Sequence, residues 1–129
     1  MTVAGIIEQY NTERPNNVED ALKKDFLKRV EQMIIDIIIK NHQGAPDEEE
    51  LIEHIEDFDI DTELLVEEPY DDLYIYYLDQ RISLNNNDTK RYNVASQLYN
   101  NALLTYQQKY NREHKSIQPG SYLIRHEVL

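Results

Sequence analysis

The sequence predicts an all-α protein, a small bundle of about four helices that ends in an antiparallel helical hairpin. The chain has 129 residues, the length of one domain with a single modest core. Three glycines and four prolines supply few of the tight turns that a β-sandwich or barrel needs. Apolar residues instead recur with helical spacing through most of the chain. We therefore expect one domain made of two N-terminal helices (1–43), an acidic loop (44–68), a helical hairpin (69–113) and an extended docking tail (114–129).

Two helices are expected in the first third of the chain. In residues 2–10 the apolar side chains fall at i, i+3, i+4 and i+7, and Thr2 is a suitable N-cap. A longer helix is expected over 18–42, with Asn16 and Asn17 offering its cap. The second half of that helix reads MIIDIIIK and carries isoleucines on more than one face. A helix of this kind is usually sandwiched between neighbouring elements.

The acidic loop carries the charge excess of a chain whose net charge is −12. No Lys or Arg lies between Lys40 and Arg81, and more than half of the 25 acidic residues fall in this interval. Because so many neighbouring carboxylates repel one another in a long helix, we expect a loop with at most one marginal helix. The exposed acids either only keep the protein soluble or meet a basic partner or a DNA channel. The candidate residues are Asp47, Glu48, Glu49, Glu50, Asp57, Asp59 and Asp61.

Two further helices are expected after the acidic loop. Pro69 is suited to the start of a helix, and helical spacing of apolar residues continues to about Leu84. The sequence NNND then breaks the helix, and Asp88 offers the N-cap of a last helix that reaches about Glu113. Helices joined by so short a connection fold back on each other as an antiparallel hairpin.

Tyrosines recur every seven residues along the last predicted helix, with alanines between them that permit close helix approach. The stripe is either an internal seam of the hairpin or, in part, a contact with another subunit, where one end of each ring stays hydrated. We expect Tyr74, Tyr77, Tyr92 and Tyr99 to be mostly internal. The candidate subunit interface is Tyr106 and Tyr110 together with Tyr122, Leu123 and Ile124 of the tail.

The residues give little sign of catalysis or of a cofactor. The chain has no cysteine, and it lacks a P-loop, a dinucleotide-binding glycine motif and the common hydrolase motifs. The acids of DFDIDTELLVEE have the spacing of a calcium loop, but Thr62 stands where the sharp turn requires glycine. His54 lies among acids but has no second histidine within helical reach, which favours an ordinary exposed side chain. We expect a non-enzymatic protein with no metal and no cofactor.

Four short motifs lie in the second half of the chain. The motif P-Y-D-x-L-Y occupies 69–74, Y-L-x-x-x-I occupies 77–82, R-Y-N-x-S/A occupies 91–95, and Y-N-R-x-H occupies 110–114. Together with the opening MTVAGIIEQYNTERPN, these motifs resemble a group of small helical proteins from phages and prophages of Gram-positive bacteria. These proteins resemble the head-to-tail connector, or neck adaptor, of long-tailed phages. The acidic loop and the sequence SYLIRHEVL at the C-terminus depart from the pattern.

The resemblance implies a structural virion protein that forms a ring of identical subunits, expected to number twelve. The ring would dock under the portal protein, contact a further neck or tail-completion protein, and extend the channel through which DNA passes without specific binding. We expect a soluble chain without a membrane segment, made in the host cytoplasm and located in the virion neck. In this setting the tail would become ordered in the assembled neck by adding a strand to a neighbour. The rival hypothesis is an acidic helical phage protein that binds a basic host or viral partner.

Overall fold

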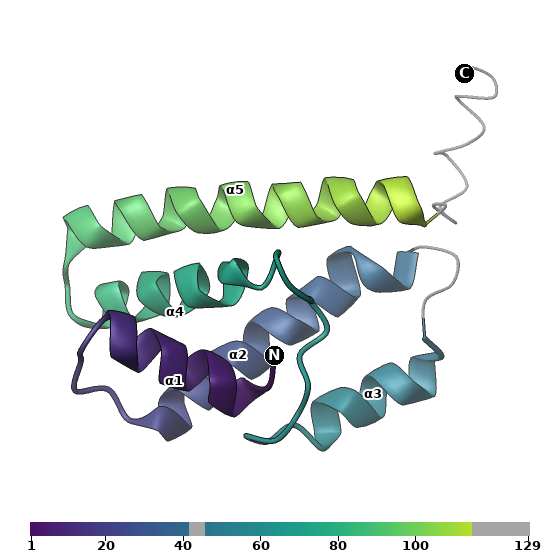
Figure 1. Ribbon diagram of the computed structural model, residues 1–129, viewed down its shortest axis with the longest axis horizontal. Helices are drawn as coiled ribbons and strands as arrows, with labels where there is room; N and C mark the ends of the chain where they lie inside the picture. The colour runs from purple at the N-terminus through teal and green to yellow at the C-terminus, as the bar shows by residue number, and fades with distance from the viewer. Residues whose placement is uncertain (42–45, 115–129) are drawn as a thin grey trace.

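The computed structural model describes residues 1–41 and 46–114 and is an all-α bundle (Figure 1). Within these residues the chain forms five α-helices and one short 3₁₀ helix, η1. Their bounds are α1 Val3–Glu13, α2 Asp20–Ile37, η1 Ile39–Asn41, α3 Glu48–Glu56, α4 Asp72–Asn85 and α5 Thr89–Glu113. The predicted fold class is therefore confirmed. Most of the predicted tail, including Tyr122, Leu123 and Ile124, lies outside the described residues.

The two N-terminal helices form largely as expected, with one correction at the start of α2. The Thr2 hydroxyl accepts a hydrogen bond from the Gly5 amide at 3.1 Å, so Thr2 caps α1 as predicted. Asn16 does not cap α2, because its side-chain oxygen accepts from the Val18 amide inside the connection. Helix α2 begins only at Asp20, and its N-cap residue makes no side-chain hydrogen bond to the helix.

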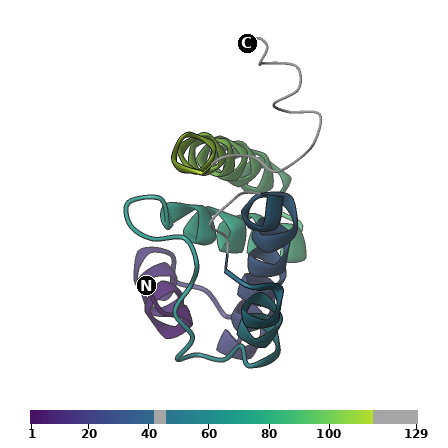
Figure 2. The same ribbon diagram turned by 90° about the vertical axis from the view of Figure 1, so that its right-hand side faces the viewer.

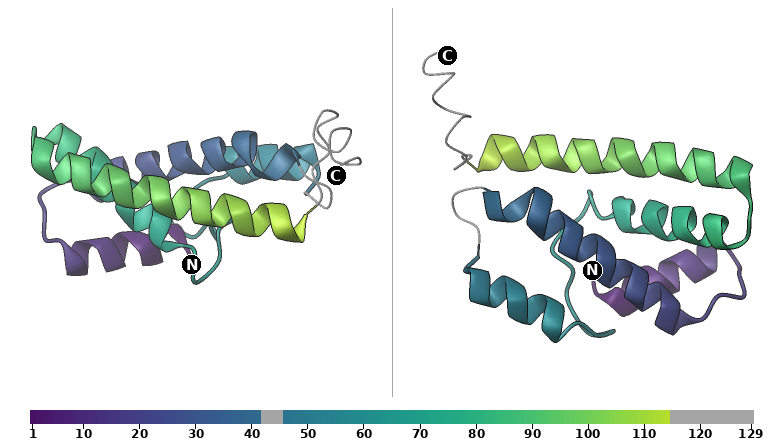
Figure 3. Two further views of the ribbon diagram at one scale, coloured as in Figure 1. Left: turned by 90° about the horizontal axis from the view of Figure 1, so that it is seen from above. Right: turned by 180° about the vertical axis from the view of Figure 1, so that it is seen from behind.

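Helices α4 and α5 form the predicted antiparallel hairpin, and α5 runs along nearly the whole length of the molecule (Figure 3). The Asp88 carboxylate accepts a hydrogen bond from the Arg91 amide at 3.1 Å, which confirms this residue as the N-cap of α5. Helix α4 begins later than Pro69 suggested, because residues 69–71 form a turn that leads into Asp72.

Helix α4 lies at the centre of the bundle. It packs against α5 on one side and against α1 and α2 on the other, while α3 contacts α2 (Figure 2). The end of α2 and η1 bury four isoleucines, and the one exception, Ile37, is half exposed. The second half of the second predicted helix is thus buried on most of its faces, as expected. The buried isoleucines are Ile34, Ile35, Ile38 and Ile39.

Within the expected acidic loop, 44–68, the described residues contain one short helix, as the prediction allowed. Residues 48–56 form helix α3, and the segment after α3 is fixed to the N-terminus by backbone hydrogen bonds. The amides of Val3 and Ala4 donate to the carbonyl oxygens of Thr62 and Ile60, at 3.0 and 2.9 Å. These bonds supply acceptors for the free amides at the start of α1. The same segment buries Phe58, Leu64 and Val66 in the core.

Candidate interaction surfaces

A buried carboxylate fixes the position of the acidic helix α3. Glu31 of α2 has no exposed surface, and both of its oxygens are engaged. One accepts a hydrogen bond from the Tyr74 hydroxyl at 2.6 Å, and the other lies 2.6 Å from His54 Nε2 and 2.8 Å from the Leu65 amide. The Glu31 cluster therefore joins α2, α3, α4 and the segment between α3 and α4. His54, which we expected to be an ordinary exposed residue, is a partner of this carboxylate.

A second buried carboxylate joins α4 to α1 and to the start of α5. Asp79 of α4 is almost fully buried and accepts hydrogen bonds from the Tyr10 hydroxyl at 2.9 Å and from Arg91 at 2.8 Å. Its other oxygen lies 3.5 Å from Arg14 Nε. Burial, followed by the charge of Asp79, raises the pKa of the Tyr10 phenol. These contacts bind α1 and the start of α5 to α4.

Both buried carboxylates interrupt apolar series, which is the sequence signal that could have revealed them. Glu31 takes the second place in the helical series Leu27, Glu31, Ile34 and Ile38. Asp79 follows Ile75 by four residues, and Ile82 follows Ile75 by seven. A charged residue at such a position is buried when partners surround it. Their partners come from distant parts of the chain, so spacing alone does not identify the hydrogen bonds.

The tyrosine stripe of α5 lies inside the subunit. Tyr99, Tyr106 and Tyr110 are buried, at 5%, 2% and 7% exposure, whereas Tyr92 is only partly buried. The expectation that Tyr106 and Tyr110 differ from the internal rings is therefore wrong. The segment before α4 folds over the second half of α5 and brings the Tyr70 ring to 6.1 Å from that of Tyr106.

The rings at the end of α5 contact one another in series, first as a tilted pair and then as a stacked pair. The ring centroids of Tyr106 and Tyr110 are 5.9 Å apart, and the His114 ring stacks on Tyr110 at 3.9 Å. The Lys109 ammonium group lies 5.8 Å from the Tyr106 ring and pairs with Glu67 and Glu113. The Tyr and His of the motif Y-N-R-x-H are thus one helical turn apart so that their rings can stack.

The buried tyrosine hydroxyls of α4 and α5 differ in their partners. The Tyr74 hydroxyl donates to Glu31 and accepts from the Val66 amide at 3.0 Å, whereas the Tyr99 hydroxyl is buried without a hydrogen-bond partner among the described residues. Burial is the main cause that raises the pKa of both phenols, with Glu31 adding to it for Tyr74 and Tyr77 for Tyr99. The stripe is therefore a dry internal seam over most of its length.

The predicted acidic residues are all exposed and lie in one region of the chain, which we call the acidic face. It consists of α3 and the turn that follows it, and every candidate residue is on it: Asp47, Glu48, Glu49, Glu50, Asp57, Asp59 and Asp61. None of these carboxylates forms an ion pair with another described residue. The acidic face therefore carries a dense negative charge with no ion-pair partner among residues 1–41 and 46–114.

The acids do not assemble into a calcium site. Asp59 instead uses its carboxylate to accept a hydrogen bond from the Asp61 amide at 2.8 Å, which closes a turn. Among residues 1–41 and 46–114 there is no group of three or more side chains that could hold a metal ion.

The surface of the molecule opposite the acidic face carries far fewer acidic residues. Helix α5 has no acidic residue before Glu113, its last residue. Its outward side, which we call the α5 outer face, exposes three aliphatic side chains: Val94 at 56%, Leu98 at 38% and Leu104 at 52%. The other exposed residues of α5 before Glu113 are polar or basic: Thr89, Lys90, Asn93, Gln97, Asn100, Asn101, Thr105, Gln108, Asn111 and Arg112. Both Figure 1 and Figure 2 place α5 and α3 at opposite edges of the bundle.

Comparison with protein-family models, with curated proteins and with solved structures found no match. Over the part of the chain that the structure describes, no helix has the length and apolar character needed to span a bilayer.

Proposed function

We propose that the chain is a structural, non-enzymatic subunit of a phage head-to-tail connector. Identical copies form a ring in the virion neck, dock under the portal protein and extend the DNA channel toward the tail. The four motifs on which the resemblance is based lie on α4, α5 and the turn before α4. The residues of these four motifs therefore belong to the α4–α5 hairpin and the turn before it. Several of them, including Tyr74, Tyr110 and His114, make contacts inside the subunit.

The α5 outer face is the observation that carries this proposal. A cyclic ring joins identical copies through a heterologous contact, so each copy must bury a surface against a different surface of its neighbour. Bringing two acidic faces together would cost energy through like-charge repulsion. The α5 outer face combines exposed aliphatic residues with amides and has no acid, so a neighbour can cover it without that repulsion.

The acidic face has a separate role in the proposed ring, where it is directed toward the channel. Negative side chains there disfavour adhesion of the DNA phosphates and let the duplex pass. A ring structure with residues 47–68 on the outer rim would contradict this part of the proposal and leave the ring itself intact.

Assembly on the portal protein of the same genome tests the proposed function. Sedimentation and electron microscopy of the mixture should reveal a ring bound to the portal. Replacing Leu98 by Asp should abolish the ring, because it places a charge in the subunit contact. Leu22→Asp is the matched control, because Leu22 is a leucine of nearly equal exposure, 37% against 38%, on α2. Failure of the wild-type chain to bind portal, or equal loss of the ring in both variants, would refute the proposal.

The carboxylates of the acidic face have no ion pair with a described residue, and this supports one alternative, an acidic helical phage protein that captures a basic host or viral partner. That function predicts a free monomer or dimer whose complex weakens steeply as salt is added. It also predicts that charge reversal on α3 abolishes binding, whereas Leu98→Asp leaves it unchanged.

A further inference from the structure

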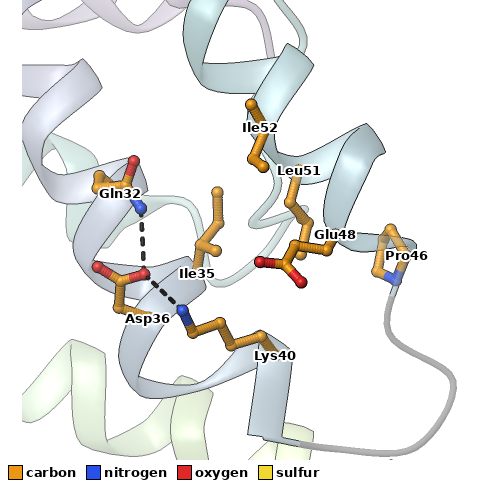
Figure 4. A pocket seen from close by; sticks show the side chains of 8 residues that line it. All are labelled: Gln32, Ile35, Asp36, Lys40, Pro46, Glu48, Leu51 and Ile52. Atoms are coloured by element: carbon orange, nitrogen blue, oxygen red, sulfur yellow. Dashed lines mark hydrogen bonds and ion pairs between the residues drawn. The ribbon is translucent and has the colours of Figure 1, made fainter.

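A cleft lies between the second half of α2 and α3, and Figure 4 shows the side chains that line it. Its volume is about 340 Å³, at the lower end of the range for ligand-binding pockets. The floor is apolar and consists of buried Ile35 and Leu51 together with Ile52, whose side chain is 48% exposed. The remaining lining residues are Gln32, Asp36, Lys40, Pro46 and Glu48.

The polar residues on the two sides of the cleft differ in whether their charges are paired. On the α2 side, Asp36 accepts a hydrogen bond from Gln32 at 3.1 Å and pairs with Lys40 at 3.4 Å, so these groups satisfy one another. On the α3 side, the Glu48 carboxylate points toward the cleft and has no ion pair or hydrogen bond with a described residue (Figure 4). The cleft thus offers an apolar floor and one uncompensated negative charge, which together fit an apolar segment followed by a cation.

We propose that this cleft binds the C-terminal segment of its own chain, residues 122–125. The sequence there is Tyr-Leu-Ile-Arg, three large apolar residues followed by Arg125. The apolar side chains would cover Ile35, Leu51 and Ile52, and the Arg125 guanidinium would pair with Glu48. Arginine forms bidentate hydrogen bonds with carboxylates, so it suits this site better than lysine does.

The course of the chain makes this occupant accessible. A second hollow is lined by His114, at the end of α5, and by Pro46, which also lines the cleft. The two hollows are therefore neighbours at Pro46. Residues 115–121 can span up to about 23 Å when extended, at roughly 3.3 Å per residue. A tether of this length gives an effective concentration on the order of millimolar, which favours the same chain over a second copy.

Because the natural chain has no cysteine, an introduced cysteine pair gives a specific test. In the full-length protein, Ile52→Cys with Leu123→Cys is compared with Ile60→Cys with Leu123→Cys under mild oxidation. Ile60 is the matched control, because it is 52% exposed against 48% for Ile52 and does not line the cleft. We expect an intramolecular disulfide in the first pair, forming about tenfold faster than in the control pair. Similar rates in the two pairs, or mainly intermolecular products from the first pair, would overturn the proposal.

A charge reversal separates specific docking from loose apolar contact. Glu48→Lys in the first cysteine pair should slow disulfide formation several-fold, because it removes the partner of Arg125 and adds repulsion. Glu49→Lys is the control, since Glu49 is equally acidic and exposed but does not line the cleft. Equal slowing by both changes would overturn the assignment of Glu48. Neither readout depends on ring formation or on the portal, so the inference stands or fails separately from the proposed function.

Discussion

The Tyr74 hydroxyl offers a sharp test of the idea that buried polar contacts hold this bundle together. Replacing Tyr74 by Phe keeps the ring, which is fully buried, and removes only the hydroxyl. That hydroxyl donates to the Glu31 carboxylate at 2.6 Å and accepts from the Val66 amide at 3.0 Å. The substitution therefore deletes two hydrogen bonds and leaves both partners in a dry environment.

The expected loss of unfolding free energy follows from those two bonds. A hydrogen bond to a charged group contributes about 1.5–3 kcal/mol, and a buried donor left without an acceptor costs about 1–3 kcal/mol. Val66 is fully buried, so water does not replace the lost acceptor. Because the two contributions share one hydroxyl and the site relaxes in part, we expect a total of about 3 kcal/mol. For a domain of this size that corresponds to a fall in Tm of roughly 10–15 °C.

Urea unfolding followed by far-UV circular dichroism measures this loss, since the chain has no tryptophan. Tyr99→Phe is the matched control, because its hydroxyl is buried without a hydrogen-bond partner among the described residues. We expect this control to be neutral or slightly stabilising, since it removes an unsatisfied polar group. A Tyr74→Phe protein within 1 kcal/mol of wild type, or equal losses in the two variants, would refute the reasoning.

Two pH effects follow from the same burial. Burial raises the pKa of Tyr10, Tyr74 and Tyr106 above the ordinary value of 10.0, so the folded state holds these protons more tightly than the unfolded chain. Stability should therefore be intact below pH 10 and fall above it, with phenolate absorbance appearing together with the loss of helical circular dichroism. Phenolate forming in full before unfolding would contradict this. Burial, followed by the charge of Glu68, likewise raises the pKa of Asp71 above 3.8, so its ionised form costs stability at neutral pH. Asp71→Asn should raise Tm at pH 7, and the gain should shrink toward pH 4; a gain independent of pH would contradict this cause.

The hairpin could be predicted from the sequence because its signals are local. The sequence NNND ends one helix, Asp88 caps the next, and the short connection leaves little choice but an antiparallel return. Thr2 identified the start of α1 in the same way. The cap predicted at Asn16 failed because its side chain satisfies the Val18 amide within the connection, a competing local hydrogen bond that these residue types readily make.

Features that depend on contacts between distant residues were not predicted. The high charge of 44–68 indicated a loop, but Leu51 packs in the core and His54 reaches Glu31 of α2, and these contacts stabilise α3. The same limit applies to the tyrosines of α5. Their spacing placed them on one face, but only the fold shows that Tyr70 covers Tyr106.

The Glu31 cluster also explains how so acidic a helix remains attached to the bundle. Nine-residue α3 begins with three consecutive glutamates, whose mutual repulsion opposes helix formation. Against this, His54 and the Leu65 amide bind the buried Glu31 carboxylate, one from the helix and one from the segment that follows it. These contacts hold the second half of α3 and the segment after the acidic turn against α2, so the charges between them are presented in a fixed arrangement. A channel wall and the cleft beside α2 both require such an arrangement, whereas a purely solubilising acidic segment would not.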